Sequence, residues 1–87
     1  MRILGYQQIT SLSAATALTI PAGTGKVILR PATQAVRFRS DGTNPTASVG
    51  FPIPVGEKFE LEISSLPAFR VIEQTASATL EVLYLGD

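Results

Sequence analysis

The sequence predicts an all-β protein, a small antiparallel β-sandwich or jelly-roll-like barrel of seven or eight short strands. Short segments alternate between apolar and polar residues with the period of two that is typical of half-buried strands. Six prolines and seven glycines punctuate the chain, and no window keeps the period of a helix. The 87 residues correspond to one domain, so we expect residues 1–87 to form a single β domain.

The first part of the chain gives the weakest strand signals. Residues 3–10, ILGYQQIT, are a candidate strand without clear alternation. The segment 11–18, SLSAATAL, contains alanines that suit a helix, together with serines and threonines that suit one less well. Because this segment continues directly into the apolar residues 16–20, TALTI, we expect a strand over 16–20.

Five later segments, 26–30, 35–40, 58–63, 68–73 and 78–85, predict the strands most clearly. In each of them every second residue is apolar, so one side of the strand is expected to be buried and the other to face outward. The side chains expected to face inward are Val27, Leu29, Val36, Phe38, Phe59, Leu61, Ile63, Phe69, Val71, Leu80, Val82 and Tyr84.

Two short motifs recur at the same offset of 33 residues, which indicates a pseudo-repeat. Ile-Pro-Ala-Gly at 20–23 returns as Ile-Pro-Val-Gly at 53–56, and Ala-Val-Arg at 35–37 returns as Ala-Phe-Arg at 68–70. Two similar β-motifs packed face to face around a pseudo-twofold axis would explain the recurrence, and chance reuse of a common turn is the alternative. In either case proline fixes φ and glycine permits a left-handed conformation, so the expected turn-shaping residues are Pro21, Gly23, Pro54 and Gly56.

The stretch Ser-Asp-Gly-Thr-Asn-Pro that starts at residue 40 reads as a turn between the two halves. Asp41 is expected to accept backbone N–H groups, Gly42 to adopt a left-handed conformation, and Pro45 to keep the residues after it extended. Metal binding by Asp41 is the less favoured alternative, because no second carboxylate lies near it in the sequence. The segment 46–50, TASVG, is expected to form a short strand.

Composition argues against several functions. The chain has no histidine and no cysteine, so its serines and threonines lack the usual activating base. We therefore expect no enzymatic activity, no metal site and no cofactor. Seven basic and seven acidic residues balance, which argues against nucleic acid or an anionic membrane as partner. No segment is expected to be a secretory signal or to span a bilayer, and no small-molecule substrate is expected.

Several apolar side chains are expected on the outer sides of strands, and they are Ile28, Ile72, Leu83 and Leu85. In a chain with only 16% charged residues, such a set indicates a surface that is covered in the working state. Contact with another subunit is the favoured explanation, and coverage by an N-terminal segment is the alternative. Arginines interleaved with these positions suit the polar margin of such an interface, and they are Arg30, Arg37, Arg39 and Arg70.

The stretches AVRFRSDGTNPTASVGFPIPVGEKFEL at 35–61 and AFRVIEQTASATLEVLYL at 68–85 resemble a group of small virion structural proteins of tailed bacteriophages. The resemblance covers residues 16–85 and depends on Arg37, Arg39, Asp41, Gly42, Pro45, Thr46, Gly50, Arg70 and Ile72. It leaves out residues 1–15, which would form an N-terminal arm if the chain has an arm that reaches its neighbours.

The resemblance implies a decoration or cement protein that binds the outside of a phage capsid and stabilises it. Its partners would be other copies of itself, with a trimer favoured, and the major capsid protein. It would be made in the host cytoplasm and reside in the virion. The eight outward residues given above would then be the candidate subunit or capsid interface. The alternative is a ligand-binding or glycan-binding β-module of a phage tail, or a component of the head–tail connector.

Overall fold

The computed structural model of the protein describes residues 2–62 and 68–86, and all regular structure in these ranges is β-strand. This confirms the all-β class expected from the alternating segments. The seven strands are β1 (Arg2–Ile9), β2 (Thr24–Pro31), β3 (Val36–Arg39), β4 (Phe51–Ile53), β5 (Phe59–Glu62), β6 (Arg70–Glu73) and β7 (Leu80–Gly86).

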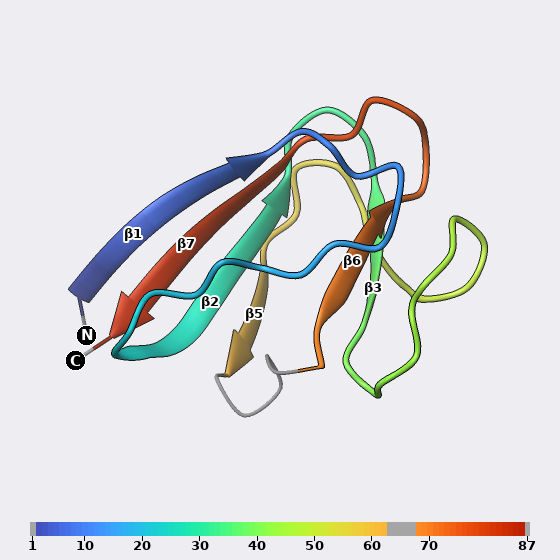
Figure 1. Ribbon diagram of the computed structural model, residues 1–87. Coiled ribbons are helices and arrows are strands. Elements are labelled where there is room, and N and C mark those ends of the chain that lie inside the picture. The colour runs from blue at the N-terminus through green and yellow to red at the C-terminus, as the bar shows by residue number, and fades with distance from the viewer. Residues whose placement is uncertain (1, 63–67, 87) are drawn as a thin grey trace.

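The strands form two antiparallel sheets that pack as a sandwich (Figure 1). The larger sheet has the order β1-β7-β2-β5, and the smaller sheet has the order β4-β3-β6. The described ends of the chain lie side by side, because Arg2 at the start of β1 pairs with Gly86 at the end of β7. This places β1 at one edge of the larger sheet and β5 at the other.

The core lies between the two sheets, on the sides of the strands that the alternation predicts. Val27 and Leu29 of β2, Val36 of β3 and Val82 of β7 are completely buried, whereas the residues between them are partly or fully exposed. Removing such side chains from water stabilises the fold by about 1.5–3 kcal/mol each. The expectation for Ile63 lies outside the described residues.

All four phenylalanines of the chain meet in one cluster at the β4 and β5 side of the sandwich. The ring of Phe38 lies 5.0–5.6 Å from those of Phe51, Phe59 and Phe69. Phe69 is buried in the centre, Phe59 is half-buried and Phe51 is exposed. The cluster therefore runs from the core to the surface.

The prediction of a strand over residues 16–20 is wrong. Only Thr16 pairs with a strand, through two reciprocal backbone bonds of 2.9 Å with Val71 of β6. The chain then runs across the larger sheet (Figure 1). Leu18 and Ile20 pack against the core there, although they belong to no strand. Burial here follows from coverage of the larger sheet rather than from strand pairing, so an apolar run alone could not distinguish the two.

Residues 2–12 of the possible N-terminal arm, 1–15, belong to the sandwich. Arg2–Ile9 forms β1, which pairs with β7 from Arg2 to Ile9 with an irregularity between Ile3 and Gly5. Leu12 is completely buried, and its carbonyl accepts a bond from the amide of Glu73. Residues 2–12 therefore contribute an edge strand and a core side chain.

The two Ile-Pro-x-Gly motifs form similar turns. The carbonyl oxygens of Pro21 and Pro54 each accept a bond of 3.3 Å from the amide three residues later, and the intervening glycines, Gly23 and Gly56, have φ of +87° and +82°. Glycine suits these φ values, because a Cβ atom at this position would be crowded by the backbone.

The two strands that directly follow these turns, β2 and β5, pair with each other. The next strands of the two motifs, β3 and β6, also pair with each other. The similarity stops at the next strand, because β4 joins the smaller sheet whereas β7 joins the larger one. The 33-residue pseudo-repeat itself stays a prediction.

Candidate functional site

The eight residues expected at an interface lie on two different surfaces. Four of them, Ile28, Arg30, Leu83 and Leu85, belong to β2 and β7 and face outward from the larger sheet. The other four lie on β3 and β6 of the smaller sheet, and they are Arg37, Arg39, Arg70 and Ile72. The fold therefore separates them into two sets of four rather than joining them in one patch.

The outer side of the larger sheet carries a continuous apolar area. Strand pairing aligns Tyr6 of β1 with Leu83 of β7 and then with Ile28 of β2. One row further along, Ile3 of β1 lies opposite Leu85. We call these five residues, Ile3, Tyr6, Ile28, Leu83 and Leu85, the outer apolar area.

Two members of the outer apolar area on β1 are the most exposed: 64% of Ile3 and 58% of Tyr6 face solvent. A shallow cavity of about 230 Å³ lies beside Tyr6, Ile28 and Leu83. Charged residues border it, and the Tyr6 hydroxyl donates a 3.1 Å bond to Glu81. Partial desolvation and this acidic neighbour raise the pKa of Tyr6 above its ordinary value.

On the smaller sheet, three of the expected interface arginines make contacts within the chain. The Arg37 guanidinium donates a 2.8 Å bond to the carbonyl of Gly50, and Arg70 donates a 2.7 Å bond to the carbonyl of Phe69. Arg39 forms a two-point ion pair with Asp41. These three side chains bond to groups of the same chain and are partly buried, whereas Arg30 is exposed on β2.

The loop after β3 is organised by Asp41. Its carboxylate accepts a 3.0 Å bond from Nε of Arg39, a second bond from the same guanidinium, and a 3.3 Å bond from the amide of Thr43. The hydrogen bonds from Arg39 are the main cause that lowers the pKa of Asp41, and the Thr43 amide adds to it. Gly42, with φ of +88°, completes the turn.

The segment 46–50, expected as a strand, is instead a tight turn. The backbone groups of Thr46 and Val49 bond reciprocally at 2.8 and 3.3 Å, and the Thr46 hydroxyl accepts a 2.9 Å bond from the Val49 amide. Pro45 is buried against Gly50, within the loop that Arg37 holds. The threonine side chain satisfies the backbone locally, which competes with strand pairing.

The sequence reasoning missed a second exposed apolar surface, next to β4. Phe51 is 61% exposed, Val49 is 55% exposed and Val55 is 48% exposed. We call these three residues the β4 patch. In β4, Phe51 lies on the same side of the strand as the buried Ile53, and its ring lies against Phe38 and Phe59. It remains exposed because β4 is an edge strand, and no other strand among the described residues covers the ring.

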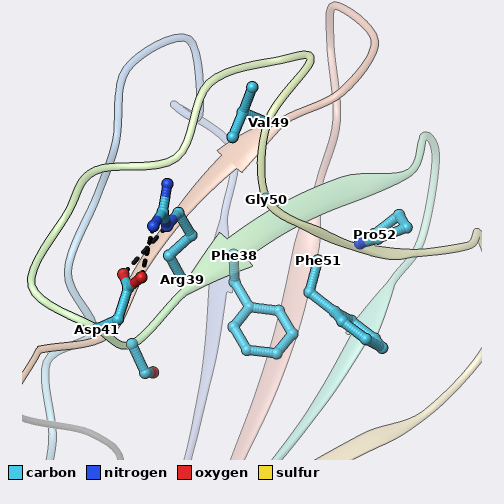
Figure 2. Close-up of a pocket in the computed structure, with 8 residues that line it drawn as sticks. Phe38, Arg39, Asp41, Val49, Gly50, Phe51 and Pro52 are labelled. Atoms are coloured by element: carbon cyan, nitrogen blue, oxygen red, sulfur yellow. Dashed lines mark hydrogen bonds and ion pairs between the residues drawn. The ribbon is translucent and has the colours of Figure 1, made fainter.

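An open pocket of about 660 Å³ adjoins the β4 patch (Figure 2). Figure 2 shows the rings of Phe38 and Phe51 side by side, while the Arg39–Asp41 ion pair lies on the other side of β3. The lining thus combines an exposed aromatic ring, apolar side chains and one ion pair. This composition resembles the centre and the margin of a protein contact surface.

The outer edge of β4 cannot accept a complete additional strand. Pro52, at the centre of β4, has no N–H, so the bonds to β3 must come from Phe51 and Ile53. The proline nitrogen therefore lies on the edge that faces away from β3. Binding at the β4 patch is expected to depend on side chains rather than on backbone pairing.

Among residues 2–62 and 68–86, no group of three or more acidic, histidine or cysteine side chains is placed to hold a metal ion. The same part of the chain has no helix that is long and apolar enough to cross a membrane. Comparison with known proteins gave no match to a family model, to a curated protein or to a solved structure.

Proposed function

We propose that the protein is a structural virion protein of the decoration or cement type, which binds the outside of a bacteriophage capsid and stabilises it. The observation that carries a contact function is the exposure of large apolar side chains on two surfaces, the outer apolar area and the β4 patch. Exposed apolar surface of this kind typically marks a protein interaction site. The assignment to a virion rests on the resemblance of residues 16–85 to small phage proteins.

The β4 patch is the part that we assign to the capsid. Phe51 is a rigid aromatic side chain, already supported from behind by Phe38 and Phe59, so binding would cost it little conformational freedom. Buried aromatic residues of this type are frequent hot spots of binding energy. Even if each contact is weak, its repetition over many equivalent positions of a shell would stabilise the particle by multivalency.

Self-association is the second part of the proposal. The chain has a net charge of zero, so copies do not repel one another strongly. A domain of 87 residues has a thin core and gains stability from association. We therefore propose a homo-oligomer on the capsid surface, for which the phage resemblance favours a trimer.

The test is co-sedimentation of the purified protein with capsids of the phage that encodes it, detected by mass spectrometry of the particle fraction. We expect the wild-type protein to sediment with capsids and Phe51→Asp to remain in the supernatant, because a charge would be buried against the partner. Gln74→Asp introduces the same charge at an exposed site beyond β6 and should bind like the wild type. Absence of the wild-type protein from the particle fraction would contradict the proposal.

A glycan-binding module of a phage tail is the second candidate, favoured by two exposed aromatic side chains, Phe51 and Tyr6. Sugar rings pack their C–H groups on aromatic faces, and the Arg39–Asp41 pair beside Phe51 could bind hydroxyl groups. A glycan array distinguishes the candidates. Specific binding that Phe51→Ala abolishes would support the module, and the absence of any bound glycan would remove it.

A further inference from the structure

The sandwich has four edge strands, and three of them are protected from further pairing in different ways. The free side of β6 is occupied by the segment that contains Leu12 and Thr16, which bonds to Glu73 and Val71. The edge of β4 is interrupted by Pro52. Charges and short strands are common protections of sheet edges, and β5 has both: it has four residues, two of which are glutamates.

The fourth edge strand, β1, has none of these protections. It has eight residues, no proline, and a single charged residue, Arg2, at its start. Figure 1 shows it as the outermost strand of the larger sheet, with no segment beyond it. Its pairing with β7 is irregular between Ile3 and Gly5, which leaves Gly5–Ile9 as a regular and uncharged edge.

A regular, unpaired edge presents a row of backbone N–H and C=O groups, which readily bond to another strand. Within the described residues, the backbone bonds outside the strand ladders do not involve β1. Two identical strands that pair antiparallel are related by a twofold axis, and each then satisfies the other's free groups. We propose that β1 pairs antiparallel with β1 of a second copy, which joins the two larger sheets into one sheet of eight strands.

The side chains of β1 favour a second copy as the partner. Ile3 and Tyr6, the most exposed members of the outer apolar area, lie on this strand. Antiparallel pairing would place them next to the apolar side chains of the other copy, so the two outer apolar areas would become continuous. The arginines at position 2 would lie at opposite ends of the paired strands, so these like charges would not meet.

This inference deepens the proposed self-association by naming its surface and its symmetry, and it differs from the trimer that the phage resemblance favours. The measurement is the native mass of the full chain over a range of concentrations. We expect a dimer for the wild type. Tyr6→Lys should weaken association by about tenfold or more, because two like charges would face each other across the new pair. Gln74→Lys, at an exposed site beyond β6 and outside both contact surfaces, should remain dimeric.

Because the chain has no cysteine, a single introduced cysteine gives a second test by cross-linking. Copies with Tyr6→Cys should form an intermolecular disulfide with one another under mild oxidation, because the two positions 6 face each other in this pairing. Glu60→Cys, on the protected β5 edge, should not. A wild-type monomer at all concentrations would overturn both the pairing and the proposed self-association. A trimer, or a dimer unaffected by Tyr6→Lys and without the β1 cross-link, would overturn only the pairing.

Discussion

At the scale of single residues, Asp41 determines how the chain leaves β3. Its carboxylate is bonded at the same time to the Arg39 side chain and to the Thr43 amide, so it links strand and loop. Both partners favour the ionised form and therefore lower its pKa. The loop that carries Val49 of the β4 patch starts at this residue.

The lowered pKa of Asp41 gives a direct prediction. A pH titration followed by NMR should give a midpoint for Asp41 below its ordinary value of 3.8, and Arg39→Gln should move that midpoint back upward. The sign for stability follows: the ionised carboxylate stabilises the fold above the unfolded-state pKa, and this contribution is lost as pH falls through the lowered folded-state pKa. An unchanged midpoint in Arg39→Gln would show that the ion pair is not formed in solution.

Phe51 shows what a sequence can and cannot predict at this scale. The alternation of Val36 and Phe38 with Arg37 and Arg39 correctly predicts which side chains face the core. The expected strands do not include residues 51–53, so neither the direction of Phe51 nor its exposure follows from that alternation. Exposure depends on whether β4 lies at the edge or the centre of a sheet, and that is decided by pairing between distant segments.

At the scale of elements, the strands differ in how their sheet edges are protected against pairing. A proline blocks the edge of β4, whereas the edge of β1 is regular and uncharged from Gly5 to Ile9. Because both strands expose apolar side chains, only the backbone distinguishes an edge suited to side-chain contact from one suited to strand pairing.

This difference predicts the effect of giving β4 a backbone donor. Pro52→Val should preserve the fold, since the proline nitrogen makes no bond to β3 and valine suits a strand. It should also promote association that depends on concentration, because the β4 edge would then have a free N–H beside Phe51. Light scattering or native mass against the wild type measures this. No additional association would mean that Pro52 does not protect the edge.

The first twenty residues show the limit of periodicity as a guide to elements. The strand β1 lacks clear alternation because Gly5 and Gln7 occupy positions on its inner side, and Gln7 accepts a hydrogen bond from the buried Tyr84. The apolar run at 16–20 forms no strand, because it covers the open sandwich instead of pairing in a sheet. Both outcomes depend on tertiary contacts that local sequence does not encode.

Leu12 tests whether this region is an integral part of the domain. Leu12→Ala should lower the free energy of unfolding by about 2–5 kcal/mol, the usual result of emptying a buried leucine site. A domain of this length has about 4–13 kcal/mol in total, so the loss would be large. Ser13→Ala, at an exposed neighbour, should change stability by no more than about 0.5 kcal/mol. A small effect of Leu12→Ala in chemical denaturation would favour a detached arm.

At the scale of the whole molecule, the two surfaces that we assign to contacts are well separated. The β1 edge lies at one end of the order β1-β7-β2-β5, while the β4 patch lies beside β5 at the other end, where the rings of Phe51 and Phe59 are 5.7 Å apart. One subunit could therefore pair with a second copy and bind a capsid at the same time. A protein with two independent contacts of this kind can connect neighbouring positions of a shell.

The most direct test of this account is electron cryo-microscopy of the assembled phage particle. We expect density for the sandwich on the outer surface of the capsid, with the β4 patch, Val49, Phe51 and Val55, buried against the major capsid protein. Particles that lack this density would contradict it, and so would particles in which the sandwich is present but the β4 patch faces solvent.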